Sequence, residues 1–132
     1  VAAMNDVRGR APKDTVFVLA YTQEAHPTGE KSPYSDQEWV PLKNQEEDVL
    51  LPQTRTLEER LANARRAAAT LGEQRVVGVD GMDNAAWRAF GGRANSVFVI
   101  GPDGVLNAAW EYPDPAALAG YLKDPRLRLA LR

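Results

Sequence analysis

Residues 15–21 read Thr-Val-Phe-Val-Leu-Ala-Tyr and form the first strong structural signal of the chain. The run is continuous, apolar and rich in β-branched and aromatic residues, which is typical of a strand buried on both faces. Such strands belong to parallel sheets that carry helices on each side. The run therefore predicts a central strand of an α/β fold, and residues 21–27 follow it at the sheet end where such folds place their chemistry.

The composition of the chain is that of an ordinary globular protein. Its 132 residues are 44% hydrophobic and 26% charged, with a formal net charge of −2. The length fits a single domain over residues 1–132. The small negative charge gives no reason to expect nucleic acid as a partner. No apolar run approaches the roughly 18 residues that span a bilayer, and no signal-peptide pattern opens the sequence, so we expect no membrane partner and a cytoplasmic location.

The chain contains no cysteine and only one histidine, His26. It therefore offers no disulfide, no thiolate nucleophile and no cysteine ligand for a metal. A single histidine also argues against a zinc site. We expect neither a metal nor a bound cofactor in this chain.

Helical and strand patterns alternate on either side of residues 15–21. In chain order we expect a helix over 1–8, a strand over 15–21, a helix over 56–71, a strand over 75–80, a short helix opened by Asp83, strands over 96–100 and 105–110, and a helix opened by Asp114. Alternation requires parallel strands, whereas the turn at 101–104 joins the last two strands as an antiparallel hairpin. The prediction is a thioredoxin-like α/β fold with a central mixed sheet flanked by helices, in which the first strand is absent.

Residues 27–55 carry no periodic pattern and form a long loop insertion rich in Pro, Gly and Ser. Loops of this length inside a domain are more often functional than accidental. We expect Trp39 and residues 49–51 to pin it to the body. A substrate-covering segment and a mobile surface excursion both remain open.

The helix expected over 56–71 begins with a capping box formed by Thr56 and Glu59 and ends at Gly72. Its apolar stripe consists of Leu57, Leu61, Ala64, Ala68 and Leu71. Three arginines, Arg60, Arg65 and Arg66, are interpreted as a solvated outer face.

Other conspicuous side chains have structural interpretations. Asp80 ends a strand, where a carboxylate commonly caps the next turn. Trp87, Phe90 and Tyr121 are expected in the core. The basic, leucine-bearing segment 125–132 is interpreted as a frayed terminus.

Residues 21–28 read Tyr-Thr-Gln-Glu-Ala-His-Pro-Thr. This segment resembles the Tyr-Ile-x-Glu-Ala-His-Pro-Ser segment of the iodothyronine deiodinases and their bacterial deiodinase-like relatives, a branch of the thioredoxin-like superfamily. Residues 51–60, 80–84, 90–92 and 97–100 continue the resemblance, which spans residues 1–121. Its most specific part is the Glu-Ala-His-Pro segment combined with the long insertion.

The resemblance implies reductive dehalogenation by a selenocysteine or cysteine at the start of the first helix of the fold. That position falls upstream of Val1, so we expect the chain as given to be inactive alone. Glu24 and His26 match family residues that lie beside the nucleophile and pass protons or contact the phenolic end of the substrate. The resemblance further implies a small aromatic or halogenated substrate, a thiol reductant and, since family members dimerise, a homodimer.

Two more positions align with substrate-binding residues of the family but differ from them. Thr54 aligns with a histidine and Ser96 with an arginine. Ala94 aligns with the cis-proline of many thioredoxin-like proteins. These departures favour a bacterial-type redox protein with another acceptor over a thyroid hormone enzyme.

Two alternatives to an enzyme of this kind remain open. The chain is equally compatible with a non-catalytic thioredoxin-fold module that binds a partner, or with a peroxiredoxin-like redox protein. For His26, the structural alternative is a histidine bonded only to backbone. Its place between Glu24 and Pro27, after a central strand, favours a functional role.

Overall fold

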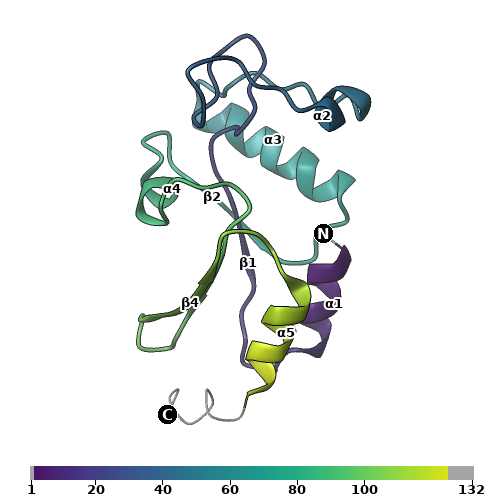
Figure 1. The fold of residues 1–132 in the computed structure, drawn as a ribbon, viewed down its shortest axis with the longest axis vertical. Helices are drawn as coiled ribbons and strands as arrows, with labels where there is room; N and C mark the ends of the chain where they lie inside the picture. The colour runs from purple at the N-terminus through teal and green to yellow at the C-terminus, as the bar shows by residue number, and fades with distance from the viewer. Residues whose placement is uncertain (1, 125–132) are drawn as a thin grey trace. The chain divides into compact units, whose positions relative to one another are not determined.

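The computed structural model describes residues 2–124, so the segment 125–132 lies outside the described residues. Its elements, in chain order, are α1 (Ala2–Arg10), β1 (Val18–Tyr21), α2 (Leu42–Glu46), α3 (Leu57–Thr70), β2 (Val76–Val79), α4 (Ala85–Ala89), β3 (Val97–Ile100), β4 (Leu106–Trp110) and α5 (Pro115–Lys123) (Figure 1). The order of helices and strands is the predicted one, with α2 added inside the long loop. None of the helices in residues 2–124 has the length and apolarity that crossing a membrane requires.

The described strands form two separate two-stranded sheets. β1 pairs with β2 in parallel, and β3 pairs with β4 in an antiparallel hairpin. In the hairpin Val97 lies opposite Trp110, and a bulge interrupts the register between Val99 and Ile100. The predicted α/β class, the parallel pair and the C-terminal hairpin are confirmed. The single central mixed sheet is not formed within the described residues.

The predicted strand over 15–21 is shorter and more exposed than its apolar sequence indicates. β1 begins only at Val18, and Val16 is 76% exposed. Burial on both faces was expected because continuous apolar strands usually sit inside a wide sheet. β1 pairs with β2 alone in its sheet, and its residues alternate between exposed and partly buried.

The helix α3 begins as the sequence predicts. The Thr56 hydroxyl accepts a hydrogen bond from the Glu59 N–H, and the Glu59 carboxylate accepts one from the Thr56 N–H, both at 3.2 Å. After the helix, Gly72 has a φ of 59°, a left-handed conformation that glycine adopts without strain. The predicted apolar stripe is only partly buried, because Leu57 and Leu71 at the two ends of the helix are exposed.

The expectation of a solvated Arg60 is wrong. Arg60 is only 1% exposed, whereas Arg65 and Arg66 are exposed as predicted. Arg60 precedes the buried Ala64 by four residues. At 3.6 residues per turn this spacing places the two side chains on the same, inner face of α3.

The short helix α4 is capped by Asp80 rather than by Asp83, correcting the sequence prediction for Asp83. The Asp80 carboxylate accepts hydrogen bonds from the N–H groups of Ala86 (3.0 Å) and Trp87 (2.9 Å). The predicted capping role of Asp80 is thereby confirmed. Asn84 occupies the N-cap position with a φ of 52° and makes no capping side-chain bond of its own.

Gly91 and Gly92 follow α4 with φ values of 83° and 64°, as expected for residues that end a helix. A Cβ at Gly92 would lie 3.1 Å from the Trp87 ring. Trp87 is half-buried, but Phe90 is exposed, so the core prediction for Phe90 is wrong. Phe90 is the residue that ends a helix of five residues, a position that offers little cover.

The chain packs as two compact units. The first comprises, within the described residues, 2–19, 68–76 and 93–124; the second comprises Ala20–Ala67 and Val77–Gly92. In the first unit α1 packs on α5, burying Val7 and Leu118, and α1 continues through Gly9, where the sequence predicted its end. Tyr121 meets Trp110 edge to face, with ring centroids 5.6 Å apart.

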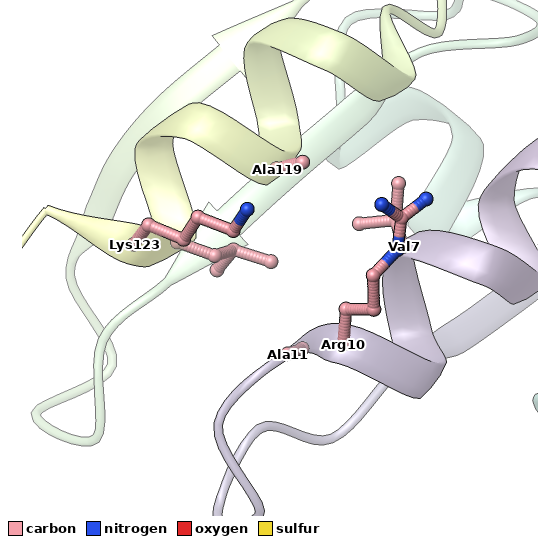
Figure 2. Close-up of a pocket in the computed structure, with 6 residues that line it drawn as sticks. Val7, Arg10, Ala11, Ala119 and Lys123 are labelled. Carbon is pink, nitrogen blue, oxygen red and sulfur yellow. The ribbon is translucent and has the colours of Figure 1, made fainter.

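A hollow lies between α1 and α5, where Val7 and Ala119 face each other (Figure 2). Its volume is about 10 Å³. This is the room for about one water molecule, so the hollow is a packing gap and not a ligand site.

The second unit contains the long loop. The loop is closed at its base by a hydrogen bond of 2.9 Å from the Thr28 N–H to the Leu51 carbonyl. Trp39 is 49% exposed, and Val49 and Leu50 are exposed as well. The expectation that Val49 and Leu50 pin the loop to the body is therefore wrong, whereas Leu51 is half-buried and Trp39 meets the His26 ring. Backbone bonds and Ser32, whose hydroxyl donates to the Ala25 carbonyl, also hold the loop.

Candidate functional site

Glu24 lies three residues beyond the end of β1, in the second unit. The Tyr21 hydroxyl, at the last position of the strand, donates a hydrogen bond to the Glu24 carboxyl. The Gln53 side chain holds the Glu24 backbone from the other direction. Its amide oxygen accepts from the Glu24 N–H at 2.9 Å, and its NH₂ group donates to the Glu24 carbonyl at 3.2 Å. Both the side chain and the backbone of Glu24 are thus fixed.

The buried Arg60 joins the segments around Glu24. Its Nε donates to the Thr54 hydroxyl at 3.3 Å. Its Nη1 donates to the carbonyls of Asp80 (3.2 Å) and Gly81 (2.6 Å) and to the Asn84 side-chain oxygen (2.9 Å).

Asn84 links Arg60 to Gln23, the residue before Glu24. While its side-chain oxygen accepts from Arg60, its NH₂ group donates to the Gln23 side-chain oxygen at 3.1 Å. A continuous set of hydrogen bonds therefore runs from α3 to the segment that carries Glu24.

The pKa of Glu24 lies above its ordinary value. Burial raises the pKa of Glu24, because the charged form loses hydration. The hydrogen bond from Tyr21, the positive charges of Arg60 and Arg66 and the Asn63 side chain act in the opposite direction but do not outweigh burial. Burial together with the hydrogen bond and the charge of Glu24 also raises the pKa of Tyr21. Tyr21 and Glu24 are thus joined by a hydrogen bond, and the pKa of each side chain is raised.

The pKa of Asp80 is shifted in the opposite direction, below its ordinary value. Burial alone would raise the pKa of Asp80, but hydrogen bonds from the N–H groups of Trp87, Ala86 and Gly81, with the charge of Arg60, lower it. Asp80 therefore remains a carboxylate whose function is to hold α4.

His26 is oriented by Trp39. The imidazole Nδ1 lies 3.0 Å from the Trp39 carbonyl oxygen, and the two rings meet edge to face with centroids 4.6 Å apart. Because a carbonyl oxygen only accepts, Nδ1 carries the hydrogen, and Nε2 is left as the nitrogen that can take up or give a proton.

The structure does not join Glu24 and His26 to each other. No hydrogen bond links their side chains within residues 2–124; Glu24 contacts Tyr21, and His26 contacts Trp39. Glu24 therefore does not orient the His26 imidazole, although the two residues are close in the sequence. Each group has its own partner.

The two weaker candidates, Thr54 and Ser96, have different surroundings. Thr54 is buried and reaches the Glu24 neighbourhood through Arg60. Ser96 belongs to the first unit, directly before β3, and its buried hydroxyl has no hydrogen-bond partner among the described residues.

Four residues of this neighbourhood escaped the sequence analysis: Tyr21, Gln53, Arg60 and Asn84. Arg60 had a readable signal, since it precedes Ala64 of the predicted apolar stripe by four residues. Tyr21 stands at the end of an expected strand and opens the segment that resembles the deiodinases, but neither pattern assigns it a role. Gln53 and Asn84 lie within the matched ranges 51–60 and 80–84, and nothing in their local sequence indicates hydrogen bonds to Glu24 or Gln23.

Among residues 2–124, no group of three His, Asp or Glu side chains is arranged to hold a metal ion. Comparison with known proteins found no family and no curated protein that matches this chain. The chemistry of the site is accordingly argued from its geometry. Glu24, whose carboxyl pKa is raised, and His26, whose Nε2 is available, both follow β1. This arrangement is suited to proton transfer.

Proposed function

We propose that the chain is a deiodinase-like, thioredoxin-fold oxidoreductase. In this proposal residues 21–26 supply the acid, and the nucleophile is a thiol or selenol that these 132 residues do not contain. The observation that carries the proposal is the half-buried Glu24 after β1, whose carboxyl is held by Tyr21 and whose backbone is held by Gln53. The resemblance of residues 21–28 to deiodinase-like proteins supports the same reaction class.

Reductive dehalogenation of an aromatic ring needs such an acid. The thiolate or selenolate attacks the iodine, so that a sulfur–iodine or selenium–iodine bond forms as the carbon–iodine bond breaks. The electron pair left on the ring carbon takes the proton of the Glu24 carboxyl, which becomes a carboxylate.

A thiol reductant completes the cycle. A first thiol displaces iodide from the sulfur or selenium and forms a mixed disulfide or selenenyl sulfide. A second thiol releases the nucleophile and leaves as the oxidised disulfide. An aryl iodide and two thiols thus become an arene, hydrogen iodide and one disulfide, and Glu24 regains its proton from solvent.

His26 has a separate role in this proposal. Its Nε2 is directed by the bond between Nδ1 and Trp39, and it binds the phenolic oxygen of a small aromatic substrate. The exposed Trp39 ring beside it offers an apolar surface for that ring.

The test is an assay of a protein extended upstream of Val1 as its gene directs, with selenocysteine inserted if an in-frame stop codon reads as one. Release of iodide from an iodinated phenol is measured with dithiothreitol as the reductant. We expect activity in the extended protein, a loss of about a hundredfold to ten-thousandfold in Glu24→Gln, and no loss in Glu58→Gln, an exposed acid of α3. An extended protein that contains a thiol or selenol and releases no iodide contradicts the proposal.

The exposed apolar side chains of the loop favour a second candidate, the non-catalytic binding module. Trp39, Leu42 and Leu50 present apolar surface that a protein partner could cover. Continued inactivity of the extended protein favours this module. Consumption of hydrogen peroxide in place of iodide release favours a peroxiredoxin-like protein.

A further inference from the structure

We propose that Arg60 is the positioning residue of Glu24: it ties together the two chain segments that hold Gln23 and Glu24 after β1. The inference rests on the proposed function of Glu24 as an acid. Arg60 itself touches neither the Glu24 side chain by a hydrogen bond nor any group that reacts.

The first connection runs through the end of the long loop. Arg60 Nε donates to the Thr54 hydroxyl, and both side chains are buried. The preceding residue, Gln53, makes the two hydrogen bonds that clamp the Glu24 backbone. Fixing Thr54 therefore fixes the amide that sets the position of Glu24.

The second connection runs through the segment between β2 and α4. Arg60 Nη1 binds the Asp80 and Gly81 carbonyls and the Asn84 side chain. Asn84 then binds Gln23, the residue before Glu24. The two connections reach adjacent residues from opposite directions, so they restrain both the place and the orientation of the carboxyl.

An arginine suits this role better than a lysine. Its guanidinium is a rigid, planar group with five N–H donors, and here Nε and Nη1 serve four acceptors on two segments. A lysine amine has three donors on one atom and cannot reach both Thr54 and the 80–84 segment in this geometry.

Arg60 also acts on Glu24 through its charge. The charged or titratable groups that influence the carboxyl are Tyr21 on β1 and Arg60 and Arg66 on α3, and both arginines lower the pKa of Glu24. Arg66 is exposed and therefore more strongly screened by solvent, whereas Arg60 is buried. Position and charge can be separated by replacing Arg60 with lysine or glutamine.

The experiment is an NMR titration of the whole chain labelled with ¹³C at the glutamate carboxyls and ¹⁵N at the backbone. In Arg60→Gln we expect the Glu24 titration midpoint to rise and the amide signals of Gln23 and Glu24 to shift. In Arg60→Lys we expect the same amide signals to shift while the midpoint stays near that of the parent, because the charge is kept. Arg65→Gln, an exposed arginine of the same helix, is the matched control and should change neither.

Two milder variants protect the test against loss of folding at Arg60. Thr54→Val removes the first connection and Asn84→Gly the second, each without a change of charge, and glycine readily adopts the φ of 52° found at position 84. We expect each to shift the Glu24 amide signal by more than Arg65→Gln does. If both variants fold and leave the Glu24 signals at their parental positions, the positioning role is overturned.

The outcome is independent of catalysis, since these measurements need no turnover. If the signals move as expected but the extended protein releases no iodide, the positioning role of Arg60 stands and the proposed function is rejected. Signals that stay in place remove the positioning role even if the extended protein is active.

Discussion

Opposing effects act on the pKa of the Glu24 carboxyl. Burial disfavours its charge, while the Tyr21 hydroxyl and the arginines of α3 favour it, and burial prevails. The pKa of Glu24 is therefore raised even though Arg60 and Arg66 both lower it. Because each of these contacts acts on the pKa of Glu24, removing any one of them has a measurable consequence.

At the residue scale, we predict that Tyr21→Phe raises the pKa of Glu24 further. The lost hydroxyl stabilises the carboxylate by a hydrogen bond, so its removal disfavours the charged form. The measurement is the carboxyl ¹³C titration of Glu24. Tyr34→Phe, which removes a hydroxyl from the long loop, is the control and should leave the titration unchanged; a lower midpoint in Tyr21→Phe would contradict the assignment.

Among the elements, α3 shows what local sequence can specify. Its first turn was predicted correctly because a capping box involves residues only three positions apart, and the same holds for Asp114, which accepts from the Ala117 N–H at 2.9 Å at the start of α5. The 101–104 turn is equally local, with a 2.9 Å bond from Gly104 N–H to the Gly101 carbonyl.

We predict that Thr56→Ala destabilises the protein by about 1 kcal/mol, the usual cost of losing an N-cap side chain. Urea unfolding followed by circular dichroism provides the measurement. Thr70→Ala, at the opposite end of α3, removes the same atoms without a capping bond and should stay within about 0.5 kcal/mol of the parent. Equal effects of the two substitutions would be inconsistent with the capping geometry.

Two glycines of different elements should respond to alanine with opposite signs. At Gly92, φ is 64° and a Cβ would meet the Trp87 ring at 3.1 Å, so Gly92→Ala should destabilise by about 1–2 kcal/mol. Gly9 lies inside α1 with nothing within 4 Å of its Cβ position, and Gly9→Ala should stabilise by about 0.5 kcal/mol. Unfolding midpoints in urea test both; destabilisation at Gly9 would contradict the helix at that position.

For the whole molecule, sequence reasoning fails where distant segments meet. The apolar pattern of residues 15–21 predicts a strand but not the number of its partners, and β1 has one partner where a wide sheet was expected. Glu24 and His26 were found because they stand together in the sequence. Gln53, Arg60 and Asn84 were not, because hydrogen bonds across 20 to 61 positions bring them into one network.

Three carboxyls, those of Glu24, Asp80 and Glu73, contribute to the dependence of stability on pH. The folded-state pKa of Glu24 lies above its ordinary 4.5, so its contribution is present below pH 4.5 and is lost as the pH rises through the raised pKa. The pKa of Asp80 lies below its ordinary 3.8, and that of Glu73, paired with Arg75, is lowered to about 2. Their contributions are present above the ordinary values and are lost as the pH falls through the lowered ones.

We therefore predict that the stability of the parent, relative to two variants, changes with pH in opposite directions. Relative to Glu24→Gln, the parent should lose stability above pH 4.5, by about 1.4 kcal/mol for each pH unit up to the folded-state pKa. Relative to Glu73→Gln, the parent should lose on the order of 2 kcal/mol as the pH falls below 4.5. Urea unfolding at several pH values gives both differences, and a parallel pair of curves would sink the assignment of the two pKa shifts.

The edge contact between His26 and Trp39 gives the molecule an optical reporter of its own. A protonated imidazole beside an excited indole quenches its emission, whereas a neutral imidazole does so weakly. The other two of the three tryptophans have different neighbours, Gly92 at Trp87 and Tyr121 at Trp110. Replacing Trp39 with phenylalanine therefore isolates the emission of the indole that contacts His26, so that fluorescence reports on His26 while carbon resonances report on Glu24.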